Sequence, residues 1–312
     1  MLSHRFHLCR TVEIKPSTPS PSKSVVFFRR GFSTLLLWGI VASIFISMQP
    51  LAYVGLVAAL VIISTLEYFK MLHVAEVKCF PRYGLFLALS YCGLSSYYLL
   101  NGAKDIPPGL DAFFIFLAAT GAFTLQLRYS IKGIEALLSV AANLLGFVYI
   151  AYLFSFASRI SFGLPGSSDV PGAFVLLWLL AVTKFSDMGA YITGSLIGKH
   201  KMIPKISPAK TWEGFAGALF FAQLAGCGLF WLLPDHLDAL HSWKHVIILG
   251  FLLAILAVIG DLAESVVKRS LNAKDSGKML PGIGGGLDLI DSICFTAPFL
   301  WFYLKGVIPY CV

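Results

Sequence analysis

Long apolar segments, separated by short polar ones, occupy most of the chain from residue 32 onwards. Each segment is long enough, at roughly 17–25 residues, to cross a bilayer as a helix. Prolines or charged residues stand between consecutive segments, where helices are expected to end. The pattern predicts an all-α, polytopic integral membrane protein with about nine transmembrane helices. The predicted spans lie near residues 32–48, 51–69, 83–101, 110–127, 134–158, 173–197, 214–233, 245–263 and 289–308.

The composition agrees with this prediction. Hydrophobic residues make up 57% of the 312 residues and charged residues only 13%, whereas soluble domains contain about 25% charged residues. The six cysteines are scattered and none has Cys-x-x-Cys spacing, so neither a zinc site nor a disulfide framework is indicated. A soluble enzyme is therefore excluded.

The distribution of the basic residues explains the net charge of +8. If the N-terminus is cytosolic and nine spans alternate, the cytosolic segments hold 19 of the 24 Lys and Arg residues. This is the bias of the positive-inside rule, so the charge indicates topology, and nucleic acid is not predicted as a partner. The cytosolic segments are then 1–31, 70–82, 128–133, 198–213 and 264–288, and Lys104, Arg159, Lys244 and Lys305 fall on or near the outer side.

The same reading gives a domain organisation. Residues 1–31 are basic and rich in Ser and Pro, which predicts a disordered cytosolic tail. Such a start also fits an organelle transit peptide. The sequence therefore agrees with either of two locations, a bacterial inner membrane or an organelle membrane. Residues 32–170 are predicted to form about five N-terminal membrane helices, and residues 171–312 a catalytic membrane region of about four helices with cytosolic loops at 198–213 and 264–288.

Acidic residues recur at helical spacing near the end of the chain. Asp261 and Glu264 are three residues apart, so they share one face of a helix. Asp288 and Asp291 repeat this spacing after a run of glycines. Two such pairs can hold a hard cation such as Mg²⁺ through their oxygens, with phosphate oxygens completing the shell.

Basic residues and glycines lie between the two carboxylate pairs. Lys268 continues the stripe of Asp261 and Glu264, and Arg269 and Lys274 follow it. Their charges can neutralise phosphate, and the bare backbone near Gly284 lets a phosphate approach closely. The alternative is a solvated loop between membrane helices, where mixed charge is common.

Two charges fall inside the predicted span 173–197. Lys184 and Asp187 are three residues apart, and each charge in a span costs about 2.5–3.5 kcal/mol on insertion scales. Their presence indicates a site that faces a polar cavity, with a mutually neutralising ion pair as the alternative.

The basic loop after that span carries a second phosphate-binding pattern. Ser207, Lys210 and Thr211 stand beside the start of the next predicted helix, and hydroxyls with one lysine at a helix start can bind a phosphate. Positive-inside topology, or contact with anionic lipids, is the alternative. Two further acids, Glu67 and Glu135, lie near span ends and are predicted to be interfacial.

The motifs of this region resemble those of the phosphatidate cytidylyltransferases, or CDP-diacylglycerol synthases. The resemblance covers about residues 180–300 and includes Asp187-x-Gly-Ala-Tyr191, Gly198-Lys199 and the run from Ser207 to Gly214. The family signature itself matches without a gap at Ser265, Val267, Lys268, Arg269, Lys274, Asp275, Pro281, Gly284, Gly285, Asp288 and Asp291.

Three positions depart from the signature. Ile283 stands where the family usually has His, Gly286 where an apolar residue is usual, and Leu289 where Arg is usual. The departures put a role for that His or Arg in doubt, but leave both carboxylate pairs intact.

The resemblance implies that CTP and phosphatidate react to give CDP-diacylglycerol and pyrophosphate. It implies CTP, phosphatidate and membrane lipids as partners and Mg²⁺ as cofactor, with room for a second cation; a monomer and a homodimer both fit. The predicted catalytic residues are Asp261, Asp288, Lys268 and Asp187, and the predicted metal ligands are Asp261, Glu264, Asp288 and Asp291. The predicted phosphate-binding residues are Lys184, Ser207, Lys210, Thr211, Arg269, Lys274, Asp275, Gly284 and Gly285.

Two other functions fit parts of the pattern. A CTP-dependent polyprenol or phytol kinase would also bind a nucleotide and a lipid, but the complete signature argues against it. An ion-coupled transporter could use Lys184, Asp187, Asp261 and Glu264 as an intramembrane path. The lack of an internal repeat argues against transport.

Overall fold

The computed structural model describes residues 39–131, 133–166, 168–273, 275–277 and 284–308. The predicted tail 1–31 and the start of the first predicted span lie outside these residues. Lys274 and Ile283 lie outside them as well.

The described residues are mainly helical and contain one two-stranded sheet, which confirms the predicted fold class. Seven helices are long and apolar enough to cross a membrane, and the exact number of spans stays a prediction. A helix over residues 39–47 precedes α2. The further elements are α2 (Pro50–Val74), α3 (Pro81–Leu100), α4 (Pro108–Gln126), α5 (Glu135–Gly146), the π-helix η1 (Phe147–Tyr152), α6 (Leu153–Gly163), α7 (Ala173–Ile197), α8 (Trp212–Leu232), the 3₁₀ turns η2 (Pro234–His236) and η3 (Asp238–Leu240), α9 (Trp243–Ser270) and α10 (Leu287–Val307).

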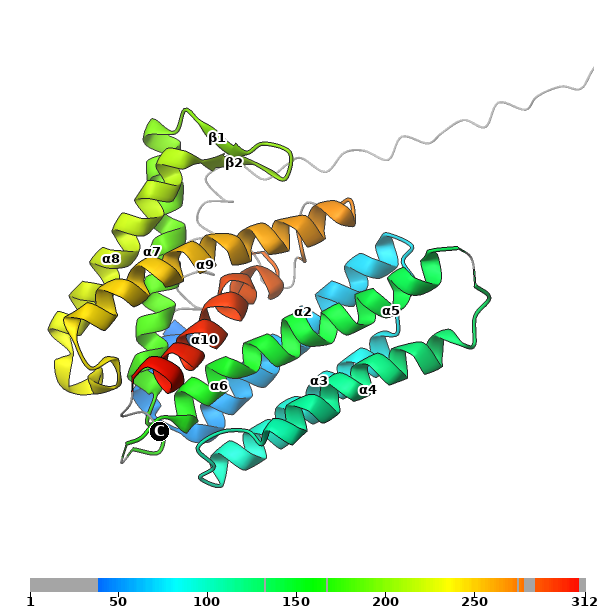
Figure 1. Cartoon of the computed structure of the whole chain (residues 1–312), viewed down its shortest axis with the longest axis horizontal. Helices are drawn as coiled ribbons and strands as arrows, with labels where there is room; N and C mark the ends of the chain where they lie inside the picture. Colours follow the sequence, from blue (N-terminus) through cyan, green and yellow to red (C-terminus); the bar gives the residue numbers. More distant parts are fainter. Residues whose placement is uncertain (1–38, 132, 167, 274, 278–283, 309–312) are drawn as a thin grey trace, which may run out of the picture.

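The helices form two groups that α10 joins (Figure 1). Helices α7, α8 and α9 pack against one another on one side, and α2 to α6 lie on the other. Helix α10 contacts α7 and α9 in the first group and α2 and α6 in the second. Its buried side, which includes Ile290, Cys294, Ala297 and Trp301, therefore fills the centre of the molecule.

A close approach of backbones holds α7 against α8. A Cβ on Gly189 of α7 would lie 2.6 Å from the carbonyl oxygen of Gly217 in α8. No side chain fits between the two helices at this level, and small residues are what allow membrane helices to pack so closely.

The loop between α7 and α8 is a small antiparallel sheet, which the sequence pattern did not predict. Strand β1 (Lys201–Ile203) pairs with β2 (Ser207–Thr211). Glu213, at the start of α8, accepts hydrogen bonds from the backbone N–H groups of Lys199 and His200. The hairpin is thereby attached to the helix that follows it.

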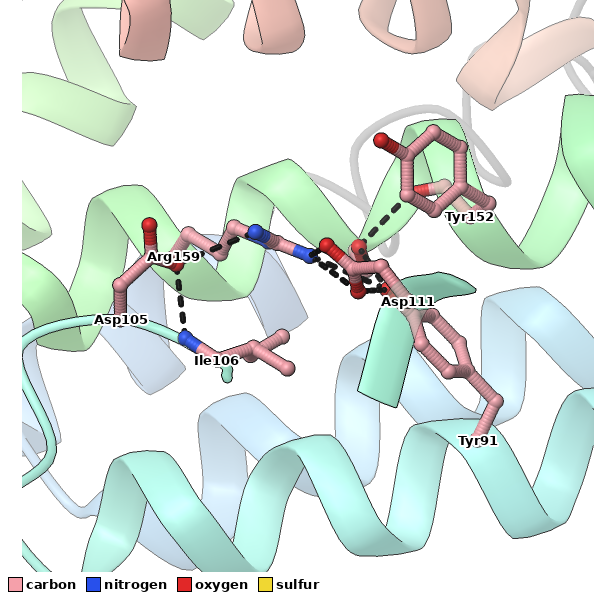
Figure 2. A network of polar contacts seen from close by, with 7 residues as sticks. Tyr91, Asp105, Ile106, Asp111, Tyr152 and Arg159 are labelled. Atoms are coloured by element: carbon pink, nitrogen blue, oxygen red, sulfur yellow. Dashed lines mark hydrogen bonds and ion pairs between the residues drawn. The ribbon is translucent and has the colours of Figure 1, made fainter. Parts of the chain in front are cut away.

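A buried arginine joins α6 to the α3–α4 segment (Figure 2). Arg159 lies 3.1 Å from Asp105 and 2.7 Å from Asp111 through its two terminal nitrogens. The hydroxyl of Tyr91 donates to Asp111 at 2.8 Å. The sequence placed Arg159 on or near the outer side and did not predict these partners. Its side chain is only 4% exposed, so Arg159 belongs to a buried ion-pair network.

We expect Arg159→Ala to lower the free energy of unfolding by about 3 kcal/mol, near the lower end of the range for breaking a buried ion pair. The lower end of the range applies because the side chain of Asp111 is 15% exposed, so the pair is not fully buried. The control Lys244→Ala removes an exposed lysine and should change it by about 0.5 kcal/mol or less. Equal unfolding temperatures for both variants in detergent would contradict a stabilising role of the network.

Candidate active site

A polar cavity of about 370 Å³ lies where α7, the hairpin, α8, α9 and α10 meet. Residues from the two motif regions line it together, although they are far apart in the sequence. The predicted site residues that line it are Asp187, Ser207, Lys210, Thr211, Asp261, Glu264, Lys268, Asp288 and Asp291.

Helix α9 places its acidic and basic residues on one face, as predicted. The helix continues to Ser270, so the first part of the predicted loop 264–288 is helical. A Cβ on Gly260 would lie 2.8 Å from the carbonyl oxygen of Asp291 in α10. The two backbones therefore touch beside Asp261, and this contact brings Asp261 close to Asp291.

Asp261, Glu264 and Asp291 form a group that could hold a cation. Each offers a carboxylate oxygen, and these oxygens all lie within 4.8 Å of one another. Glu264 and Asp291 are buried, and Glu264 Oε1 has no hydrogen-bond partner among the described residues. A cluster of carboxylate oxygens of this kind suits Mg²⁺, which prefers oxygen ligands.

Two lysines form ion pairs with acidic residues of this cavity. Lys210, from strand β2, forms an ion pair with Asp261. Lys268 Nζ lies 2.7 Å from Glu264 and 2.8 Å from Asp288. Buried carboxylates require such partners, because removing an ion from water costs several kcal/mol.

Asp288 lies at the edge of this group, with each of its carboxylate oxygens hydrogen-bonded. Asp288 Oδ2 accepts hydrogen bonds from Ser276 Oγ at 2.8 Å and from the Gly285 backbone N–H at 2.7 Å. A Cβ on Gly284 would lie 2.7 Å from the same oxygen, and Gly284 has a φ of +124°. A glycine at position 284 therefore allows the backbone to approach the Asp288 carboxylate closely. The role of Asp288 as a metal ligand stays a prediction.

Lys184 and Asp187 belong to two different cavities. Their charged atoms lie 3.5 Å apart on successive turns of α7. Asp187 lines the polar cavity, whereas Lys184 lines a mainly apolar cavity beside it. The ion pair, which was the alternative interpretation, is thus present, and Asp187 also faces the predicted polar cavity.

Thr211 serves the fold of the hairpin as well as the cavity. It is the N-cap of α8, and its hydroxyl oxygen accepts a hydrogen bond from the Gly214 N–H at 3.1 Å. This bond satisfies one of the unpaired donors at the start of the helix.

Five of the predicted phosphate-binding residues that the structure describes are not among the residues lining the polar cavity: Lys184, Arg269, Asp275, Gly284 and Gly285. Arg269 is exposed and donates to the Ala273 carbonyl oxygen at 3.3 Å. Asp275 is exposed as well. Their roles, like that of Lys274 outside the described residues, stay predictions.

The sequence analysis missed two residues that contact this site. Ser276 holds Asp288, and its place beside the predicted Asp275 could have suggested it. Glu67 was predicted only as an interfacial acid, whereas its side chain is 2% exposed and accepts a hydrogen bond from the Leu287 N–H at 3.2 Å. Only the three-dimensional structure brings α2 to the start of α10.

We expect Asp291→Asn to weaken Mn²⁺ binding, measured by electron paramagnetic resonance in detergent, by at least ~10-fold. The substitution keeps the shape of the side chain and removes one of three clustered carboxylates. The control Asp235→Asn changes an exposed acid in the η2 turn and should leave the affinity unchanged. Wild-type affinity in Asp291→Asn would contradict a cation site at this group.

Comparisons with known proteins agree with the motifs. A model of the cytidylyltransferase family matches residues 28–307. The chain is 32% identical to the uncharacterized protein YnbB of Escherichia coli (strain K12), over 86% of this chain and 85% of that protein.

Two relatives carry the name phosphatidate cytidylyltransferase. The protein of Synechocystis sp. is 30% identical, over 81% of this chain and 88% of its own length. That of Staphylococcus aureus (strain COL) is 37% identical, over 49% of this chain and 54% of its own length. These matches, with the motif residues gathered around one polar cavity, show that the chain belongs to the cytidylyltransferase family.

Proposed function

We propose that this protein is a phosphatidate cytidylyltransferase, which transfers CMP from CTP to phosphatidate and releases pyrophosphate. One observation carries the proposal. A cluster of carboxylates suited to a cation lies in a polar cavity, and helices α7 and α10 line both this cavity and a neighbouring apolar cavity. The names of the Synechocystis and Staphylococcus relatives support it.

The polar cavity suits the nucleotide. Five acidic residues and two lysines are among the described residues that line it, so the acids outnumber the cations. Divalent cations would restore the balance, and CTP would enter as their complex. Lys210 and Lys268 would turn from the carboxylates to the phosphates. Ser207 and Thr211 lie beside them and would contribute hydroxyl groups.

We infer that Mg²⁺, with room for a second cation, is the metal. Asp261, Glu264 and Asp291 would hold it, with Asp288 and Asp187 nearby. A bound Mg²⁺ neutralises the charge that develops on a phosphate during transfer.

The apolar cavity suits the lipid. It has a volume of about 200 Å³ and is lined by residues of α2, α6, α7 and α10, among them Leu56, Leu180 and Leu289. Lys184 is the charged residue among its described lining and stands one turn from Asp187. Acyl chains of phosphatidate would occupy the apolar part, with the phosphate near Lys184. Leu289, which replaces the usual Arg, extends the apolar lining.

The chemistry needs positioning more than proton transfer. An oxygen of the phosphatidate phosphate attacks the α-phosphorus of CTP and forms a new phosphorus–oxygen bond. The bond from the α-phosphorus to the bridging oxygen breaks, and its electron pair leaves with pyrophosphate. The attacking oxygen is already ionised, so no general base is required. The protein would contribute alignment and charge neutralisation.

The relatives named above come from bacteria, and we infer a bacterial inner membrane as the location. Membership of the cytidylyltransferase family argues against the transporter hypothesis. The lipid kinase remains an outcome of the tests below.

The first test measures CDP-diacylglycerol formation in detergent from CTP, phosphatidate and Mg²⁺. We expect EDTA to abolish the product and Asp261→Asn to lower kcat by at least ~100-fold, because one of the three carboxylates that would hold the cation loses its charge. The control Asp235→Asn should keep wild-type turnover. Near-normal activity in Asp261→Asn would sink the assignment of the site, and phosphorylation of an isoprenoid alcohol would favour the kinase.

The second test concerns the lipid cavity. Leu180→Trp fills part of it, and we expect KM for phosphatidate to rise roughly 10-fold with KM for CTP unchanged. The matched control Leu196→Trp lies on the same helix, where Leu196 is 78% exposed, and should leave both constants unchanged. An equal effect of Leu180→Trp on both substrates would show that this cavity does not select the lipid.

A further inference from the structure

Helix α2 places a buried acid beneath the start of α10. The carboxylate of Glu67 accepts a hydrogen bond from the backbone N–H of Leu287, the first residue of α10. Negative charge at this end of a helix is favoured by the helix dipole. The contact joins parts of the chain that are 220 residues apart.

The segment before α10 packs directly on this carboxylate. We call its described residues, 275–277 and 284–286, the glycine segment. A Cβ on Gly285 would lie 2.5 Å from Glu67 Oε2, and a Cβ on Gly277 would overlap Glu67 Oε1. Both glycines are thus required by the position of the acid, and the segment can lie flat against α2.

A second contact fixes the same segment. A Cβ on Gly286 would lie 2.5 Å from Ile63 Cγ2 and 3.3 Å from Ser64 Oγ, one turn before Glu67 on α2. Gly286 stands where the family usually has an apolar residue. In this chain, Ile63 fills the space that such a side chain would need, which gives that departure a packing reason.

The glycine segment in turn forms hydrogen bonds with Asp288, which lines the polar cavity. Ser276 Oγ and the Gly285 N–H both donate to Asp288 Oδ2. The other oxygen of Asp288 accepts a hydrogen bond from Lys268, which also pairs with Glu264. A continuous series of contacts therefore runs from α2 to the cation group.

Burying a glutamate is costly unless its charge or hydrogen bonds are satisfied. A neutral apolar side chain could fill the same space without that cost. Glu67 instead meets the backbone of the glycine segment and of α10 at several points, so its carboxylate defines where this backbone lies.

We propose that Glu67 is a positioning residue for the cation and nucleotide site, acting through the glycine segment on Asp288 and Lys268. The identity of the nucleotide rests on the proposed function, whereas the effect on cation binding does not. Glu67 touches none of the reacting atoms. Its effect should therefore appear in the geometry of the site, as a weaker cation affinity and a lower kcat.

The test is a Mn²⁺ titration by electron paramagnetic resonance in detergent, without lipid or nucleotide, on the full chain. We expect Glu67→Ala to raise the dissociation constant at least ~10-fold, as outer-shell substitutions do. Glu67→Gln keeps an oxygen acceptor at the same length and should stay within about 3-fold of wild type. Thr65→Val, a buried control on the same helix, should have no effect.

Ser276→Ala breaks the same series of contacts without altering α2. It replaces Glu67→Ala in the titration if Glu67→Ala does not fold. It should reproduce the loss of affinity. The double variant should then be no weaker than the weaker single one, since residues in one network are not additive. Wild-type affinity in Glu67→Ala or in Ser276→Ala, or independent additive losses, would overturn the proposal.

Turnover separates this proposal from the proposed function. If the wild type forms no CDP-diacylglycerol but Glu67→Ala still weakens Mn²⁺ binding, the proposed function fails and the positioning role stands. If the wild type is active and Glu67→Ala matches it in both kcat and Mn²⁺ affinity, the positioning role fails alone.

Discussion

The need to neutralise carboxylates buried between membrane helices is the constraint on which the site depends. Asp261, Glu264 and Asp291 lie within one group of oxygens, where removing charge from water is costly. Two of the three pair with lysines from different elements, Asp261 with Lys210 of the hairpin and Glu264 with Lys268 of α9. The hairpin, α9 and α10 must therefore meet, and the polar cavity is the consequence. In the proposed function, phosphates and divalent cations would enter it by replacing one set of charge pairs with another.

Much of this arrangement could be predicted because it follows from local geometry. The bilayer fixes the length of an apolar helix, so most predicted segments coincide with described helices to within about five residues, whereas α9 extends seven residues beyond its predicted end. Helical spacing placed Asp261, Glu264 and Lys268 on one face, and α9 continues to Ser270 with that face intact. The charges in α7 indicated a polar boundary because charge is expensive there. Lys184 and Asp187 do lie at such a boundary.

Long-range packing could not be predicted from one sequence. Glu67 looked like an interfacial acid because nothing nearby in the sequence explains its burial, and its partner lies in α10. The ion-pair partners of Arg159 were not predicted, since Asp105 and Asp111 become its neighbours only when α3, α4 and α6 pack (Figure 2). The hairpin was missed because its strands are short and basic, with one proline inside β2 and another between the strands. The N-terminal helices contact the start of α10 through Glu67 of α2.

The most direct measurement uses CTP labelled at either the α- or the γ-phosphate, with phosphatidate, Mg²⁺ and the purified protein in detergent. Cytidylyl transfer moves the α-phosphorus to the lipid and leaves the γ-phosphorus in pyrophosphate. The account predicts a labelled lipid only from α-labelled CTP, and none when EDTA is present. A lipid labelled from γ-labelled CTP would contradict it and would identify a kinase.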